Sequence, residues 1–155
     1  MVATAVSMRT IQRDIVGGFI FSADGKLLLG KNRKGGVYEG LFVVPGGGVD
    51  TGETKPQALR REMLEETGID IATATVTSIN ESNGAHEKTL HETGERVYVE
   101  MNFYDYRIDL LQNANDVSLH TDDDWYMPQW FAVDELQAIK TSEPVRSTLI
   151  SIGIL

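Results

Sequence analysis

Residues 47–69 have the sequence GGVDTGETKPQALRREMLEETGI, and the second half of this stretch predicts a short helix with defined ends. Residues 54–57 (TKPQ) have the S/T-x-x-E/Q form of a capping box, and the proline falls in the first turn, where a missing N–H costs nothing. Gly68 is a typical stop residue just past the end of a helix. The sequence therefore predicts a helix that begins after Thr54 and ends near Thr67.

Three glutamates of this helix, Glu62, Glu65 and Glu66, share one face. At about 100° per residue they fall within an arc of roughly 100°. Like charges at this spacing destabilise a helix by a few tenths of a kcal/mol per pair. Leu59 and Met63 lie beside the arc and are expected to be buried, so the carboxylates project from an anchored helix. Taken alone, such a cluster is typical of a solvated acidic surface, and its meaning depends on the neighbouring sequence.

The composition bounds the class of protein. The chain has 155 residues, enough for one domain with a core, and it has no cysteine, so disulfides and thiolate chemistry are excluded. No run approaches the roughly 18 apolar residues of a membrane span, and no charged leader precedes an apolar segment at the N-terminus. We therefore expect a cytoplasmic protein without a membrane partner. The net charge of −9 argues against a nucleic-acid polymer as partner but allows a small phosphorylated ligand if a cation mediates.

Segments with strand-like composition lie on both sides of the helix. The expected strands are residues 15–22, 26–30, 41–44, 71–80, 97–108 and 129–133. Residues 32–40 and 81–95 are polar and are expected to be loops, and short helices are expected at 134–140 and 143–152. Strands around a central helix, with more helix at the end, predict a mixed α/β sandwich.

The glycine run, Glu53, Arg61 and the acidic helix together resemble the Nudix box, G-x5-E-x7-R-E-U-x-E-E-x-G-U, where U is a bulky aliphatic residue. Residues 47–69 match every position of this pattern. With average residue frequencies near 7%, seven fixed identities coincide by chance on the order of once in 10⁸ windows. Outside the box, Phe42 stands where the family commonly has tryptophan, which is a mild departure.

The resemblance covers about residues 13–140 and implies one Nudix domain over residues 1–155, with 1–12 as an N-terminal extension. It implies an α/β/α sandwich with a mixed central sheet. The implied activity is metal-dependent hydrolysis of the pyrophosphate bond in a nucleoside diphosphate linked to another group, X. The implied cofactor is Mg²⁺, with Mn²⁺ as a substitute, because Mg²⁺ prefers carboxylate oxygen and shares phosphate oxygens with its substrates.

The resemblance also implies roles for individual residues. The expected metal ligands are Glu62, Glu65, Glu66 and the backbone carbonyl of Gly46. A divalent ion bound there would offset the repulsion among the glutamates. Glu62 is also the expected general base.

Four further residues complete the expected catalytic set or compete for a place in it. Arg61 is expected to hold a carboxylate by a bidentate pair, and Glu53 to add negative charge to the site. Family members sometimes draw another carboxylate from a late loop, and here Asp124 is the candidate. A polar turn is the alternative for that loop, and Glu100 is a second candidate.

The substrate stays open between a nucleoside triphosphate and a nucleotide sugar. Residues 82–85 (SNGA) lack the proline typical of ADP-ribose enzymes, and the tyrosine typical of dinucleoside-polyphosphate enzymes is also missing nearby. Because the box keeps every acid, we expect attack at phosphorus rather than at a sugar carbon. The alternative function is a non-catalytic nucleotide sensor. The expected partner is a small-molecule nucleotide, and a homodimer stays open.

Overall fold

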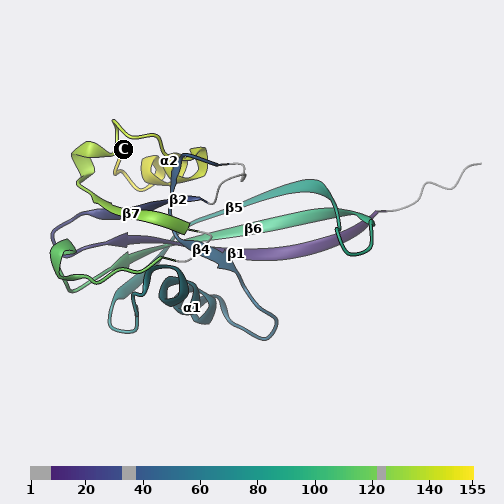
Figure 1. Ribbon diagram of the computed structural model, residues 1–155, viewed down its shortest axis with the longest axis horizontal. Helices are drawn as coiled ribbons and strands as arrows, with labels where there is room; N and C mark the ends of the chain where they lie inside the picture. Colours follow the sequence, from purple (N-terminus) through teal and green to yellow (C-terminus); the bar gives the residue numbers. More distant parts are fainter. Residues whose placement is uncertain (1–7, 33–37, 122–124) are drawn as a thin grey trace, which may run out of the picture.

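The computed structural model describes residues 8–32, 38–121 and 125–155, and it shows a mixed sheet between two helices (Figure 1). The helices α1 (Lys55–Thr67) and α2 (Glu143–Ser151) lie on opposite faces of the sheet. The strands are β1 (Arg9–Phe21), β2 (Leu27–Asn32), β3 (Phe42–Val43), β4 (Gly46–Gly48), β5 (Thr75–Thr89), β6 (Arg96–Asp109) and β7 (Trp125–Phe131). This architecture confirms the predicted α/β/α sandwich.

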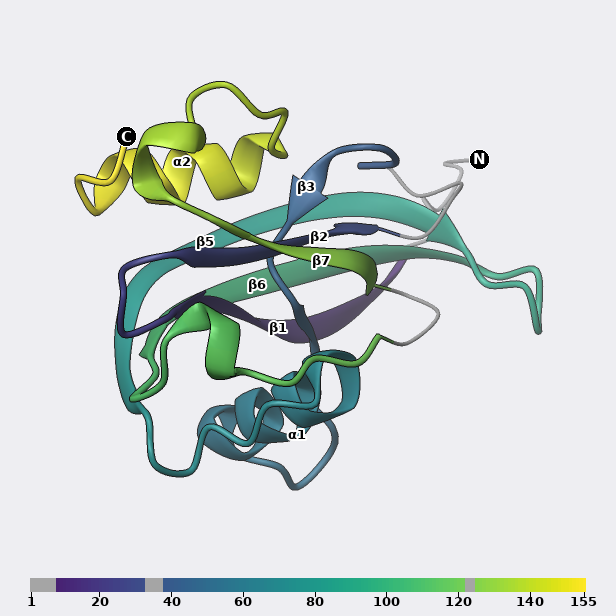
Figure 2. The ribbon, with the colours of Figure 1, turned by 60° about the vertical axis from the view of Figure 1, so that its left-hand side comes forward.

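The sheet is mixed because one central pair of strands is parallel. The order is β3-β2-β1-β6-β5, with β1 and β6 parallel along their whole lengths and the other pairs antiparallel. Two short partners complete it: β7 pairs with β2, and β4 pairs with residues 15–17 of β1. The glycine strand β4 therefore lies against the middle of the sheet, next to α1 (Figure 2).

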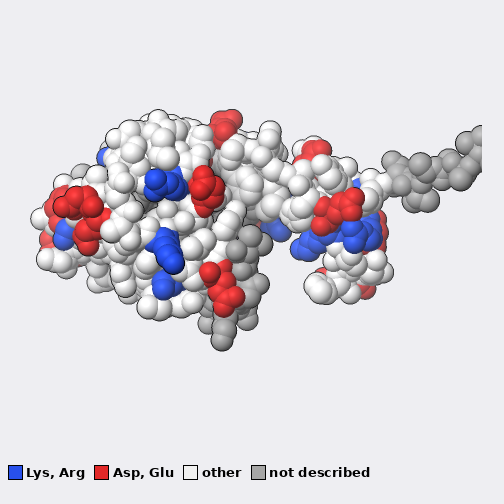
Figure 3. Space-filling model, turned by 90° about the horizontal axis from the view of Figure 1, so that it is seen from above, with Lys and Arg blue, Asp and Glu red and all other residues white. Residues whose placement is uncertain are grey.

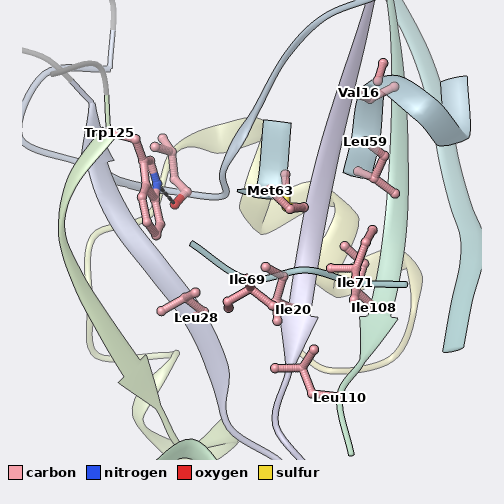
Figure 4. Packing of buried hydrophobic residues seen from close by; sticks show 12 residues of the cluster. Val16, Ile20, Leu28, Leu59, Met63, Ile69, Ile71, Ile108, Leu110 and Trp125 are labelled. Atoms are coloured by element: carbon pink, nitrogen blue, oxygen red, sulfur yellow. Dashed lines mark hydrogen bonds between the residues drawn. The ribbon is translucent and has the colours of Figure 1, made fainter. Parts of the chain in front are cut away.

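Alternate residues of β1 divide the hydrophobic core into two clusters, one on each face. Val16 and Ile20 pack in the cluster beneath α1, which also contains Leu59 and Met63 (Figure 4). Phe19 and Phe21 pack in the cluster beneath α2. Each helix is thus anchored by its own apolar cluster, as the period of two in a strand requires.

The predicted loop at 81–95 is wrong, because β5 continues to Thr89 and only residues 90–95 form the turn to β6. Residues 82–89 are exposed, so they carry no alternating hydrophobic pattern. Their strand conformation comes from pairing with β6, which is a non-local interaction. Figure 1 shows this hairpin and the first part of β1 extending beyond the helices.

One predicted helix and two strand boundaries also differ from the structure. The expected helix at 134–140 is wrong, since only a 3-10 turn forms at Val133–Glu135. The last strand begins at Trp125, four residues earlier than expected, where it pairs with β2. β1 begins at Arg9, inside the stretch expected as an N-terminal extension, because its first residues pair with β6. In the described part of the chain, no helix is long and apolar enough to span a membrane.

Candidate active site

The helix α1 has the ends that its sequence predicts. Thr54 is the N-cap: its hydroxyl accepts from the Gln57 N–H at 3.2 Å, and the Gln57 side chain accepts from the Thr54 N–H at 2.9 Å. Gly68 ends the helix with φ of 78°, a left-handed conformation that glycine adopts without strain. Leu59 and Met63 are fully buried beneath the helix, which confirms the predicted orientation.

Two of the glutamates lie against consecutive glycines of β4. The N–H of Gly46 donates to Glu66 Oε2 at 2.7 Å, and Glu66 is buried. A Cβ atom at Gly47 would come within 2.4 Å of the carboxyl carbon of Glu62, and one at Gly46 would come within 2.2 Å of the Val16 carbonyl oxygen. Glycine is therefore required at position 46, where a side chain would displace the neighbouring strand, whereas a side chain at position 47 would displace the Glu62 carboxylate.

Arg61 lies at the centre of the acidic cluster. Its Nε and Nη2 atoms donate to the two oxygens of Glu53 at 2.8 and 2.9 Å, which is a bidentate pair. Nη2 also donates to the Gly48 carbonyl at 2.9 Å. Nη1 donates to Glu62 at 2.9 Å and to Glu65 at 3.3 Å. A single guanidinium thus joins the loop before the helix to two carboxylates of the helix.

The surroundings of Glu53 and Glu62 shift their pKa values in opposite directions. Hydrogen bonds from Arg61 and from the Asp50 N–H lower the pKa of Glu53 to about 2. Burial raises the pKa of the Glu62 carboxyl, and the hydrogen bond from Arg61 offsets only part of that rise. The hydrogen bond to Glu53 raises the pKa of the Arg61 guanidinium, which stays charged. Glu53 is therefore a fixed anion, whereas Glu62 lies in an environment that favours the proton.

The donor set of the site has the chemistry that a hard divalent cation prefers. Glu62, Glu65, Glu66 and the carbonyl of Gly46 offer only oxygen, and they come from two adjacent elements. Within residues 8–32, 38–121 and 125–155, no three acidic or histidine side chains converge as a ready metal site. Arg61 Nη1 instead supplies the positive charge between Glu62 and Glu65. These oxygen donors fit a hard divalent ion, which would add its charge to that of Arg61 beside the carboxylates.

Of the two further carboxylate candidates, the structure describes only Glu100. Asp124 is outside the described residues. Glu100 lies on β6, where its side chain accepts from Gln12 Nε2 of β1 at 3.3 Å. Glu53, by contrast, belongs to the cluster, but its carboxylate is directed at Arg61 and at the loop N–H of Asp50.

Sequence reasoning missed a pocket on the α2 face of the sheet and the residues that line it. The pocket has a volume of about 440 Å³ and includes Asp105 of β6, which we predicted only as part of a strand. A lone aspartate in an aromatic segment (FYDY, 103–106) was the available signal. Arg13 of β1 was also missed: its guanidinium lies 2.9 Å from where a Gly48 Cβ would be.

A family model described as the NUDIX domain matches residues 11–151. The chain belongs to the Nudix family. It is an enzyme of this family, a Nudix pyrophosphohydrolase, in line with the complete box and with the names of its relatives.

Two named relatives align with most of this chain. The nucleoside triphosphatase NudI of Salmonella agona is 31% identical over 147 residues, covering 93% of this chain and 99% of that protein. The oxidized purine nucleoside triphosphate hydrolase of Danio rerio is 31% identical over 118 residues, covering 72% and 62%. A MutT protein from Methanosarcina mazei Go1 has a similar solved structure, with a TM-score of 0.67 at 18% identity over 93% of this chain and 94% of that one. The structural likeness confirms the fold.

Proposed function

We propose that the protein hydrolyses a pyrophosphate bond in a nucleoside diphosphate linked to X, with Mg²⁺ as cofactor and Mn²⁺ as a substitute. The observation that carries this proposal is the placement of two box acids, Glu62 and Glu66, against consecutive glycines of β4. The whole sequence, residues 1–155, acts as one domain in this proposal.

In the proposed site, four groups bind the cation, and one of them, Glu62, also acts as the general base. Glu62, Glu65, Glu66 and the Gly46 carbonyl hold the cation, which when bound polarises phosphate oxygens and favours ionisation of an attacking water. Glu62 takes the proton of that water on a carboxylate oxygen. Its carboxylate lies against Gly47 and accepts a hydrogen bond from Arg61 Nη1 at 2.9 Å.

Arg61 and Glu53 position the acids rather than contact the substrate. All three guanidinium nitrogens already donate to protein oxygens, so Arg61 has little capacity left for a phosphate. Glu53 neutralises the guanidinium and ties it to the loop. The late-loop carboxylate Asp124 remains part of the proposal as a further catalytic group.

A nucleoside triphosphate is the substrate class that the relatives favour, with a nucleotide sugar as the other candidate. Two relatives are named for action on nucleoside triphosphates, NudI and the oxidized purine nucleoside triphosphate hydrolase. The pocket of about 440 Å³ lies within the range of small-molecule sites and reaches Gly46 of β4. A nucleoside in the pocket would therefore have its phosphates near the box acids.

A panel of nucleoside triphosphates and nucleotide sugars with millimolar Mg²⁺, assayed for phosphate and pyrophosphate, tests the proposal. We expect turnover of at least one substrate and none when a chelator removes the cation. Binding of nucleotides without any turnover would instead identify a non-catalytic nucleotide sensor and contradict the proposed activity.

A further inference from the structure

The pocket on the α2 face has an apolar wall and a polar floor. Its apolar wall includes Ile15, Phe19 and Phe103, and α2 closes it from above. Gly46, whose N–H binds Glu66, lies at its rim. A planar apolar group could be held between these surfaces, while its substituents reach the box.

Asp105 on the floor belongs to a directed chain of hydrogen bonds. Asn80 Nδ2 donates to Thr148 Oγ1 at 3.2 Å, and the Thr148 hydroxyl donates to Asp105 Oδ2 at 2.9 Å. Thr148 comes from α2 and is 1% exposed, so this chain ties the helix to two strands of the sheet. Because the Thr148 hydroxyl has one proton and donates it to Oδ2, Asp105 is the terminal acceptor of the chain.

The other oxygen of Asp105 faces a second residue that lines the pocket. Oδ1 lies 3.0 Å from the position that a Cβ atom of Gly17 would take. Gly17 is paired with Asp105 across β1 and β6, and its missing side chain leaves that oxygen room. A carboxylate oxygen has about two lone-pair sites, so acceptor capacity remains at the floor of the pocket.

The pocket supplies little positive charge to balance this carboxylate. Asp105 is the only charged side chain among the described residues that line it. Burial raises the pKa of Asp105, and the hydrogen bond from Thr148 offsets part of that rise. A ligand that donates hydrogen bonds to the ionised carboxylate would compensate its burial.

We propose that Asp105 selects the base of the substrate by accepting hydrogen bonds from the two adjacent N–H donors of a guanine-type edge, the ring N1–H and the 2-amino group. This inference rests on the proposed function, since it assumes that a nucleotide occupies the pocket. The geometry of a carboxylate matches two parallel donors of one planar group.

The other common bases match an ionised carboxylate less well. Adenine and cytosine present one amino donor beside a ring acceptor, and that acceptor would repel a carboxylate oxygen. Uracil and thymine present one N–H between two carbonyl oxygens. A neutral Asp105 would instead favour adenine or cytosine, because its O–H could donate to the ring nitrogen.

Equilibrium binding of nucleoside monophosphates in the presence of a chelator tests the selection without hydrolysis. We expect GMP to bind about 10- to 100-fold more tightly than AMP or CMP, in line with the discrimination that a bidentate pair provides. IMP, which lacks the 2-amino group, and N1-methyl-GMP, which lacks the ring N–H, should each lose most of that preference. These ligand changes test the proposal even if a protein variant fails to fold.

The Asp105→Asn variant tests the residue itself, because an amide can pair with adenine. We expect the ratio of GMP to AMP affinity to fall about 10-fold or more. The matched control is Asp109→Asn, the same change on the same strand at a partly exposed aspartate paired with Arg107, and it should keep the ratio.

Two kinds of failure can be told apart. Equal affinity of the wild-type protein for all four bases would overturn the selection by Asp105. An equal loss of affinity for every nucleotide in Asp105→Asn would also overturn it, and would leave Asp105 only the structural role of binding Thr148 of α2. If the wild-type protein hydrolyses no nucleotide with Mg²⁺, the proposed function itself fails. Hydrolysis with a preference for adenine or cytosine would overturn only the inference about guanine.

Discussion

The two faces of the sheet differ in the number of charged groups at their sites and in how close together in the sequence those groups lie. On the α1 face, one guanidinium joins Glu53, Glu62 and Glu65 within hydrogen-bond distance, and all of these residues come from a stretch of 13 positions, 53–65. On the α2 face, the pocket takes its described lining from residues 15–148, with Asp105 as its single charge. Figure 3 views the α2 side, where acidic and basic side chains are interspersed among uncharged surface.

The two faces differ in how far the sequence predicts them. Helical spacing places Glu62, Glu65 and Glu66 on one face because they are neighbours in the chain, and the resemblance to the Nudix box implied the roles of Arg61 and Glu53. A pocket assembled from separate strands and a terminal helix depends on pairing that no local pattern specifies. The proposed function therefore places the chemistry on the α1 face and the choice of substrate on the α2 face.

Removal of divalent ions should have the largest effect, because it acts on the α1 face as a whole. We expect a chelator to abolish turnover. Addition of millimolar Mg²⁺ or Mn²⁺ should raise the melting temperature, since an ion that binds the folded state stabilises it by about 2.7 kcal/mol at 100 times its Kd. Unchanged melting together with full activity in a chelator would refute the metal assignment.

Glu66→Gln should have the next largest effect. The Gln oxygen can still accept from the Gly46 N–H, so the fold is kept, but the negative charge is lost. We expect turnover to fall by a factor on the order of 10² or more, as for other groups that stabilise a transition state. The preference among bases should not change.

A matched control for Glu66→Gln is Glu92→Gln, the same change at an exposed position in the turn between β5 and β6. Its turnover should equal that of the wild type. Near-normal turnover of Glu66→Gln would show that this residue does not hold the ion.

Two adjacent arginines offer a comparison of stability. Arg61 is 27% exposed and its loss leaves Glu53 and Glu62 without their shared partner, so Arg61→Ala should lower the free energy of unfolding by about 1–3 kcal/mol. Arg60 also forms a bidentate pair, with Asp70, but both side chains are about half exposed. Arg60→Ala should therefore lower the free energy of unfolding clearly less than Arg61→Ala does.

Denaturant unfolding in a chelator measures both arginine variants, and Mg²⁺ should restore part of the stability lost in Arg61→Ala. An equal loss in the free energy of unfolding for both variants would mean that Arg61 contributes no more than an ordinary surface ion pair does.

The smallest expected effect is the contribution of Glu53 to the pH dependence of the free energy of unfolding. Its pKa falls from 4.5 to about 2 on folding, so the ionised form stabilises the native state above pH 4.5. That contribution is lost as the pH falls from about 4.5 through about 2. Glu53→Gln should accordingly be less stable than the wild type at pH 6, and the difference should shrink towards pH 2. Urea unfolding at both pH values measures it, and a difference independent of pH would contradict this role.

Much of the fold on the α1 face could be predicted, because capping residues and hydrophobic spacing act locally. Thr54, Gln57 and Gly68 determine where α1 begins and ends, and Leu59 and Met63 determine which face is buried. The boxed acids and Arg61 then follow from their positions on that helix.

The strands that were missed depend on partners far away in the chain. The segment 82–89 is exposed and polar, and only its pairing with β6 makes it a strand. Gly46–Gly48 is too glycine-rich to resemble a strand, yet it pairs with β1 because the backbones can approach closely. Asp105 was predicted inside a strand, but its meeting with Thr148 depends on how α2 packs.

The position of the bond that breaks distinguishes attack of water at phosphorus from attack at a sugar carbon. Hydrolysis is carried out in water enriched in oxygen-18, with a nucleotide sugar and a nucleoside triphosphate as substrates, and mass spectrometry locates the label. We expect the label on a phosphate product, because a cation held by the acids of the α1 face would direct water to phosphorus. Label on the sugar product would show attack at carbon and would contradict the proposed cleavage at phosphorus.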